Sequence, residues 1–73
     1  MAFTLATWNI NSVRLREPLV CKFLAEHGPD VLCLQECKSP VDKIPTESFA
    51  ELGYTHMIAN GQKGYNGVAI LSK

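Results

Sequence analysis

The sequence lacks an excess of charge of either sign, because seven lysines and arginines are balanced by seven aspartates and glutamates. The basic composition that is typical of nucleic-acid-binding domains is therefore absent, although basic side chains can still cluster locally. We expect such a cluster from Arg14, Arg16, Lys38 and Lys63. The sequence also has no apolar run near the roughly 18 residues of a membrane span, which predicts a soluble protein.

Cysteine and histidine are scarce as well. The three cysteines are an odd number, and neither His27 nor His56 has a second histidine at ligand spacing, which disfavours a disulfide framework and a zinc site. The opening residues lack the basic and apolar stretches of a secretory signal, so we expect reduced thiols in the cytoplasm. Cys33 is predicted to be a small core residue, and Cys37 a reactive thiol if it is exposed.

Apolar residues are abundant instead, at 47% against 19% charged residues, which favours an α/β protein over a disordered chain. This share is high for a chain of 73 residues, since a chain of that size buries only about 60% of its unfolded surface. We therefore expect further layers of structure to cover the apolar surface. Residues 1–73 are interpreted as the incomplete N-terminal portion of a single domain.

The apolar pattern predicts about four strands and one or two helices. Residues 2–8 are rich in β-favouring side chains, and residues 30–35 form an apolar run that fits a strand buried on both faces. Between them, a helix is expected from about Pro18 to the pair Gly28 and Pro29. Its apolar face is predicted to contain Leu19, Val20, Phe23 and Leu24.

Turn signals organise the second half of the chain. A loop over residues 39–45 contains two prolines, and a short helix over residues 46–52 has Thr46 as its N-cap. Strands are expected over residues 54–59 and 68–72, joined by a glycine-containing turn.

Polar residues follow both strands of the first half. A strand, helix, strand unit joins parallel strands, so the carboxyl ends of the two strands lie at one edge of the sheet. Asn9 and Asn11 follow the first strand and Glu36 follows the second, and we expect these side chains to meet there. Mg²⁺ prefers oxygen ligands and needs only one or two carboxylates from the protein, so Glu36 with an asparagine could hold it.

Each of these residues also has a simpler interpretation. Glu36 can be an ordinary strand-end carboxylate that pairs with Lys38, and asparagines are common in turns because their side chains bond to nearby backbone. Arg14 can be an exposed residue at a helix start. The glycines of residues 61–67 suit a hairpin turn as well as a phosphate-binding loop, and the segment lacks the ending of a Walker motif.

Three segments together go beyond what spacing can show. They are residues 6–14 (Ala-Thr-Trp-Asn-Ile-Asn-Ser-Val-Arg), 29–38 (Pro-Asp-Val-Leu-Cys-Leu-Gln-Glu-Cys-Lys) and 61–72 (Gly-Gln-Lys-Gly-Tyr-Asn-Gly-Val-Ala-Ile-Leu-Ser). In order and separation they resemble the opening motifs of the exonuclease III and abasic-site endonuclease family. The resemblance implies a four-layer α/β sandwich of the DNase I-like type, with two mixed sheets packed face to face and helices outside.

The resemblance also implies roles for individual residues. Asn9 and Glu36 would act in catalysis and metal binding, with Mg²⁺ or Mn²⁺ as the cofactor. Asn11 stands where some relatives have an aspartate, which weakens any role as a direct metal ligand, and Cys37 stands where threonine is usual. The positions implied to bind nucleic acid are Arg14, Lys38, Gly64 and Tyr65.

The activity implied by the resemblance is hydrolysis of the phosphodiester 5′ to an abasic site in duplex DNA. Exonuclease activity from 3′ to 5′ and 3′-phosphatase activity are its expected companions, in an enzyme that is monomeric at full length. The family's water-activating aspartate has its position beyond residue 73, so we expect these residues alone to be inactive. Two alternatives stay open: another phosphodiesterase or phosphatase of the same sandwich class, and a non-catalytic α/β module.

Overall fold

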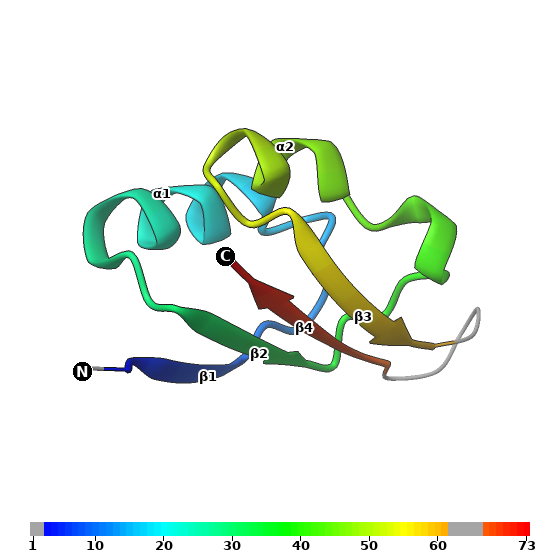
Figure 1. Cartoon of the computed structure of the whole chain (residues 1–73). Helices are drawn as coiled ribbons and strands as arrows, with labels where there is room; N and C mark the ends of the chain where they lie inside the picture. The colour runs from blue at the N-terminus through cyan, green and yellow to red at the C-terminus, as the bar shows by residue number, and fades with distance from the viewer. Residues whose placement is uncertain (1–2, 62–66) are drawn as a thin grey trace.

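The computed structural model of the chain describes residues 3–61 and 67–73 (Figure 1). Two helices, a 3₁₀ turn and four strands follow one another in the order β1, α1, β2, 3₁₀ turn, α2, β3, β4. Their bounds are Leu5–Asn9 (β1), Glu17–His27 (α1), Val31–Gln35 (β2), Val41–Lys43 (3₁₀ turn), Thr46–Glu51 (α2), His56–Asn60 (β3) and Val68–Ser72 (β4). Neither helix in the described ranges has the length and apolar character needed to cross a membrane.

The strands form one mixed sheet in the order β1-β2-β4-β3. β1 and β2 are parallel, which confirms the pairing predicted from the strand, helix, strand order. β4 is antiparallel to both of its neighbours, β2 and β3. Both helices cover the same face of this sheet (Figure 1). The expected α/β class, with four strands and two helices, is therefore confirmed.

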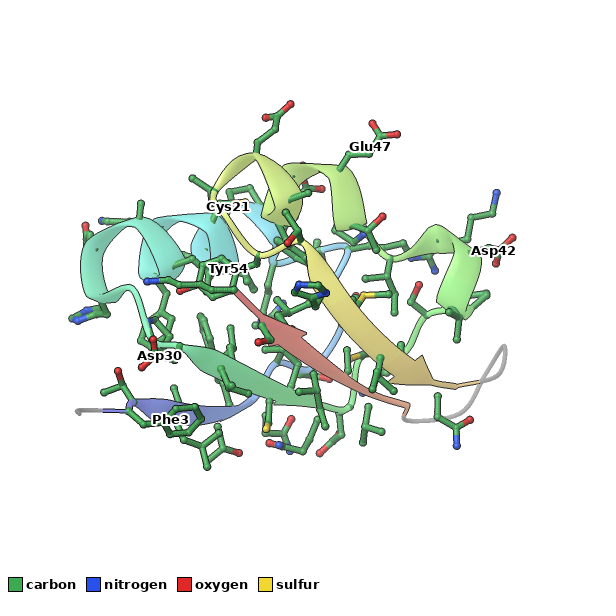
Figure 2. All side chains as sticks on the ribbon, in the orientation of Figure 1. Phe3, Cys21, Asp30, Asp42, Glu47 and Tyr54 are labelled. Carbon is green, nitrogen blue, oxygen red and sulfur yellow. The ribbon has the colours of Figure 1, made fainter. Side chains whose placement is uncertain are left out.

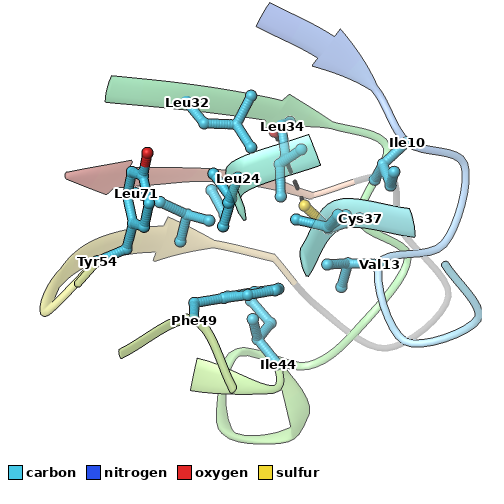
Figure 3. Packing of buried hydrophobic residues seen from close by; sticks show 12 residues of the cluster. Ile10, Val13, Leu24, Leu32, Leu34, Cys37, Ile44, Phe49, Tyr54 and Leu71 are labelled. Atoms are coloured by element: carbon cyan, nitrogen blue, oxygen red, sulfur yellow. Dashed lines mark hydrogen bonds between the residues drawn. The ribbon is translucent and has the colours of Figure 1, made fainter. Parts of the chain in front are cut away.

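The hydrophobic core fills the space between the sheet and the helices (Figure 3). Alternate residues of the strands point into it, as the period of two along a strand requires. Phe49 of α2 is fully buried against this layer. The other buried members are Ile10, Val13, Val20, Leu24, Leu32, Leu34, Cys37, Ile44, Tyr54, Ala69 and Leu71.

The opposite face of the sheet is open in the described part of the chain. Large apolar side chains are exposed there, including Ile58 at 76% and Leu5 at 62%, and Figure 2 shows Phe3 on the side away from the helices. β2 consequently alternates between buried and half-buried residues, so the expected burial on both faces is wrong. Cys33 lies on the half-buried side and is not part of the core cluster, which corrects its assignment as a core residue.

Two strands begin later than their sequences indicated. β1 starts at Leu5 because the preceding residue, Thr4, is held by the Asp30 carboxylate, which accepts from the Thr4 backbone N–H at 2.7 Å and from its hydroxyl at 3.0 Å. β3 starts at His56 because Tyr54 turns into the core, where its hydroxyl donates to the carbonyl oxygen of Pro29. β4 has the predicted bounds.

The helices also correct details of the prediction. α1 ends at Gly28, whose φ of 52° is left-handed and whose N–H donates to the Leu24 carbonyl at 3.0 Å, as the glycine predicted. Leu19 is 54% exposed and does not belong to the buried face. The assignment of Thr46 as N-cap is wrong, because Thr46 is already helical and Pro45 takes the cap position without a side-chain bond.

Candidate active site at the carboxyl edge of β1 and β2

The pairing of β1 and β2 continues beyond both strands. Backbone N–H groups of the segment after β1 donate to carbonyls at the end of β2 and just beyond it, each at 2.9 Å: Ile10 to Gln35, Ser12 to Glu36 and Val13 to Cys37. The two segments are thus joined as firmly as neighbouring strands, although neither is a regular strand. Ile10, Val13 and Cys37 are buried beneath them. These apolar anchors leave the polar residues between them on the outer surface.

The backbone at this edge adopts a conformation that residues with a side chain rarely take. Asn11, Ser12, Glu36 and Lys38 have positive φ angles of 49°, 87°, 54° and 51°. Each such residue typically costs on the order of 1–3 kcal/mol and persists only where the surroundings fix it. All four lie in the two joined segments, and three carry charged or amide side chains. Strained backbone residues cluster at functional sites, so their concentration here makes this edge of the sheet a candidate site.

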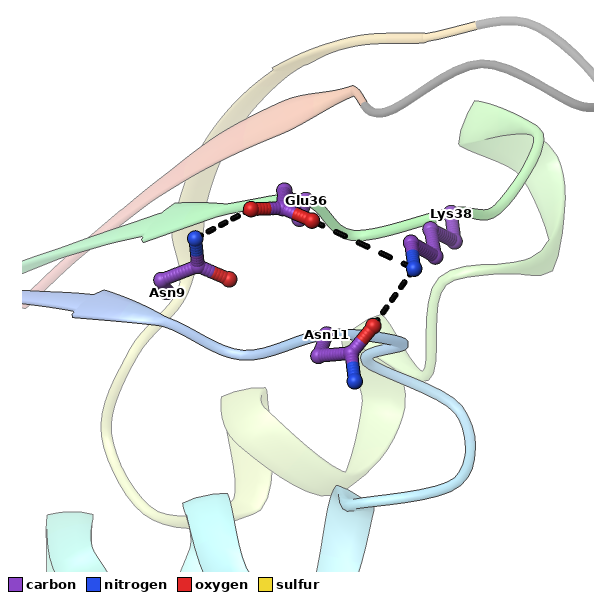
Figure 4. A network of polar contacts seen from close by, with 4 residues as sticks. All are labelled: Asn9, Asn11, Glu36 and Lys38. Atoms are coloured by element: carbon purple, nitrogen blue, oxygen red, sulfur yellow. Dashed lines mark hydrogen bonds and ion pairs between the residues drawn. The ribbon is translucent and has the colours of Figure 1, made fainter.

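Four polar side chains form one connected network (Figure 4). The Asn9 Nδ2 donates to Glu36 Oε2. The Glu36 Oε1 lies 3.9 Å from Lys38 Nζ, and Lys38 Nζ donates to Asn11 Oδ1 at 2.5 Å. The network therefore runs from Asn9 through Glu36 and Lys38 to Asn11. The side chains of Lys38 and Glu36 are 46% and 36% exposed, so a ligand can reach the pair.

The sequence prediction that Asn9, Asn11 and Glu36 meet is confirmed for one asparagine directly and for the other indirectly. Asn9 contacts the carboxylate itself, whereas Asn11 reaches it through Lys38. The simpler interpretation of an ion pair between Glu36 and Lys38 is also present, and the carboxylate takes part in both contacts. Sequence reasoning missed the bond between Lys38 and Asn11. Its only signal was that Lys38 follows Glu36 by two positions.

The donor atoms fit part of a magnesium site. Glu36 offers a carboxylate, and the amide oxygen of Asn9 is left available because its nitrogen makes the bond to Glu36. Within residues 3–61 and 67–73, no group of three or more His, Cys, Asp or Glu side chains gathers to hold a metal. One or two carboxylates are nevertheless a common protein contribution to Mg²⁺, which keeps several waters and binds substrate phosphates.

The remaining residues singled out by sequence lie in two different situations. Arg14 is exposed in the turn just after the buried Val13. Gly64 and Tyr65, and Lys63 of the expected basic cluster, lie outside the described residues. The nucleic-acid contacts expected of these positions stay predictions.

Cys37 differs from its prediction. It is only 1% exposed, and its Sγ donates to the Leu34 carbonyl oxygen at 3.7 Å (Figure 3). Loss of solvent around the thiol raises its pKa, which favours the unreactive protonated form. Exposure was the condition for a reactive thiol, and the buried Cys37 does not meet it. Cys37 serves as an apolar anchor under the loop that presents Glu36.

Comparison with known proteins adds an independent line of evidence. Residues 6–73 match the Endonuclease/Exonuclease/phosphatase family. Exodeoxyribonuclease III of Haemophilus influenzae is 40% identical over 67 residues, which cover 92% of this chain and 25% of that protein. The exodeoxyribonuclease of Bacillus subtilis is 34% identical over 94% of this chain and 27% of its own length.

Solved structures agree with the sequence relatives. An AP endonuclease from Archaeoglobus fulgidus superposes with a TM-score of 0.91 at 45% identity, over 97% of this chain and 27% of that one. The 3′ phosphatase NExo from Neisseria, bound to a product DNA hairpin, gives a TM-score of 0.90 at 46% identity with the same coverage. These similarities confirm that the four strands and two helices correspond to part of the DNase I-like sandwich. The chain spans about a quarter of the length of these relatives.

Proposed function

The chain belongs to the Endonuclease/Exonuclease/phosphatase family, and on this premise we propose that the whole protein is a metal-dependent DNA-repair nuclease. Its substrate is duplex DNA with abasic sites or 3′ ends, and its main reaction is hydrolysis of the phosphodiester 5′ to an abasic site. The 3′ to 5′ exonuclease and 3′-phosphatase reactions use the same site. The observation that carries the proposal is the bond between Asn9 and the Glu36 carboxylate at the carboxyl edge of two parallel strands.

Each polar residue of the network has a proposed role. Glu36 binds the divalent cation, Mg²⁺ or Mn²⁺, which when bound stabilises negative charge on the scissile phosphate. Asn9 orients the carboxylate through its Nδ2 and keeps an amide oxygen for the cation or its water. Lys38 offsets the negative charge of Glu36 until DNA arrives and fixes Asn11. Arg14, Gly64 and Tyr65 contact the DNA backbone.

The network has no group suited to activate water. Amides do not accept protons at neutral pH, and Glu36 is committed to the cation and to Asn9. The general base must come from the part of the protein that corresponds to the remaining three quarters of its relatives. We therefore propose that residues 1–73 form the N-terminal portion of one four-layer domain and are inactive alone. The complete enzyme is proposed to be a cytoplasmic monomer.

Choice of substrate is the finer part of the proposal. The AP endonuclease and the 3′ phosphatase are similar to this chain to nearly the same degree, at 45% and 46% identity. Overall likeness therefore favours neither reaction. We place abasic-site incision first because the Gln-Glu-Cys-Lys segment of residues 35–38 and the Gly-Tyr-Asn-Gly segment of residues 64–67 resemble motifs of that branch.

The test is incision of a duplex with a single abasic-site analogue, in parallel with release of phosphate from a duplex with a 3′-phosphate. The 73-residue chain and the longest natural reading frame that contains it are compared, each as wild type and as Glu36→Gln. Glu26→Gln is the matched control, because Glu26 is an exposed helical carboxylate paired with Lys22 at 3.9 Å.

We expect the long form alone to cut, with activity lost in EDTA and in Glu36→Gln and retained in Glu26→Gln. Faster phosphate release than incision would keep the nuclease site and reverse the order of substrates. If neither form acts on either duplex and Glu36→Gln changes nothing, the enzymatic proposal fails and a non-catalytic module is the better account.

A further inference from the structure

Gly61 directly follows β3 and Gly67 directly precedes β4, and both pack against the segment that follows Glu36. We call Gly61 and Gly67 the glycine neck. A Cβ built on Gly61 would lie 3.1 Å from the Ser39 carbonyl oxygen and 3.3 Å from the Cα of Gly67. A Cβ on Gly67 would lie 3.4 Å from both the Asn60 carbonyl oxygen and the Cα of Gly61. The neighbouring atoms are backbone, so a side chain at Gly61 could enter only by displacing it.

The glycine neck is bonded to the residue after Glu36. The Cys37 N–H donates to the Gly67 carbonyl oxygen at 3.1 Å. Gly67 directly precedes β4 whereas Cys37 lies two residues beyond β2, so this bond is offset by one residue from the register of the two strands. On the other side, the Glu36 carbonyl accepts from Ser12 N–H at 2.9 Å. Both bonds hold the peptide group between Glu36 and Cys37, and the peptide group before Glu36 is held by the bond from Ile10 N–H to the Gln35 carbonyl at 2.9 Å.

This double attachment explains how Glu36 keeps its left-handed backbone. A glutamate at φ 54° would lower its free energy by relaxing to an ordinary backbone conformation, unless its neighbours are held in place. Relaxation would rotate the direction of the side chain and carry the carboxylate away from Asn9 Nδ2. The acceptor at Gly67 is one of the bonds that prevent this. The φ of Gly67 is 74°, so this position requires a residue that tolerates the left-handed region.

We propose that Gly61 and Gly67 are positioning residues for the Glu36 carboxylate. As positioning residues, they act through the backbone that follows Glu36. The Gly67 carbonyl oxygen accepts from Cys37 N–H. Gly61 has no side chain, which allows the backbone of Ser39 and of Gly67 to approach it closely. The effect on catalysis rests on the proposed function, whereas the effect on the contact between Asn9 and Glu36 does not.

A general loss of stability would look similar in an activity assay, so a matched control is needed. Gly53 supplies it, because its φ of 98° is also left-handed, it lies in the turn between α2 and β3, and nothing lies within 4 Å of a Cβ built on it. Gly53→Ala therefore introduces backbone strain of the same kind far along the chain from Glu36. Gly67→Asn is the conservative variant, since asparagine tolerates the left-handed region better than alanine does.

The first readout is the side-chain amide signal of Asn9 in the longest natural reading frame, labelled with ¹⁵N at asparagine and recorded without metal. Gly67→Ala and Gly61→Ala should move this signal towards the position of a solvent-exposed amide. Gly53→Ala should leave it in place, and Gly67→Asn should move it less than Gly67→Ala. An Asn9 signal unchanged in Gly67→Ala, or moved equally by Gly53→Ala, overturns the proposal. If Gly67→Ala fails to fold, Gly67→Asn and Gly61→Ala decide by the same criterion.

The second readout is broadening of the same signal by Mn²⁺ alone, without DNA. Gly67→Ala should require roughly ten-fold more Mn²⁺ for half-maximal broadening, as is typical when an outer partner of a metal ligand is disturbed. Gly53→Ala should match the wild type. A wild type that is not broadened by Mn²⁺ would count against the proposed function, while the metal-free signal would still decide the positioning role.

Discussion

The two ends of the sheet handle the same backbone problem in different ways. At the site end, left-handed positions are occupied by Asn11, Ser12, Glu36, Lys38 and one glycine, Gly67. At the other end, where α1 leads into β2 and α2 into β3, they are occupied by Gly28 and Gly53. Glycine takes this conformation at little steric cost, whereas other residues are strained by it. Within the described residues, four of the five left-handed positions at the site end carry a side chain, whereas both at the opposite end are glycines.

The polar contacts differ in the same sense. At the end opposite the site, Lys73 Nζ donates to the Gly28 carbonyl at 3.0 Å and lies 5.8 Å from the centre of the Tyr54 ring. Asp30 is occupied by Thr4 in a similar way. These groups bond mainly to backbone, as structural contacts do. At the site end the side chains bond to one another and stay partly exposed, which leaves them free to exchange partners with a ligand.

The largest expected effect on stability lies at the end opposite the site. Tyr54→Phe removes the hydroxyl that donates to the buried Pro29 carbonyl, and an unpaired buried carbonyl costs about 1–3 kcal/mol. Urea unfolding should show a loss of free energy of unfolding in that range. The Asn9 side-chain signal should not move. A shift of that signal would mean that the two ends are coupled and do not differ as described.

Gly28→Ala should cost about 1–2 kcal/mol, because alanine is strained at the left-handed φ of 52°. Crowding adds little, since the nearest atom to the new Cβ would be the Lys73 Nζ at 3.5 Å, the end of a flexible side chain. Denaturant midpoints of Gly28→Ala and Gly28→Asn give the measurement. Equal losses in the two variants would point to a cause other than backbone conformation.

Ser12→Gly, at the site end, should change the free energy of unfolding in the opposite direction. Ser12 has a φ of 87°, so glycine relieves strain there, and its greater freedom in the unfolded chain offsets part of the gain. We expect the free energy of unfolding to rise by less than about 1 kcal/mol. A fall would show that the contact from Leu15 N–H to Ser12 Oγ, at 3.4 Å, outweighs the strain.

The smallest effect should come from pH at Asp30. The hydrogen bond from the Thr4 backbone, then that from the Thr4 hydroxyl, and the charge of Lys73 lower the pKa of the Asp30 carboxyl below its ordinary value of 3.8. A lowered pKa in the folded state means stability that is present above the ordinary pKa and lost as pH falls through the folded value. The difference in stability between wild type and Asp30→Asn should therefore hold down to about pH 5 and shrink in stronger acid. A difference independent of pH would contradict this assignment.

Much of the fold could be read from local pattern. The parallel pairing of β1 and β2, the end of α1 at Gly28 and the bounds of β4 all followed from periodicity and turn residues. The errors arose where a distant partner decides. Tyr54 has β-favouring character but bonds to Pro29, and Leu19 fits a helical stripe but faces solvent because its side of α1 is left uncovered.

The amino-acid sequence alone determined which residues are brought to the carboxyl edge, because the strand, helix, strand pattern predicts a parallel pair whose carboxyl ends share one edge. Tertiary structure alone decided how they meet. Asn9 and Glu36 are 27 positions apart, and the left-handed backbone of Glu36 is held by bonds from the segment after β1 and from Gly67. Such a conformation is unfavourable for the isolated residue, so no local pattern predicts it. Only the surrounding contacts make it the state of lowest free energy.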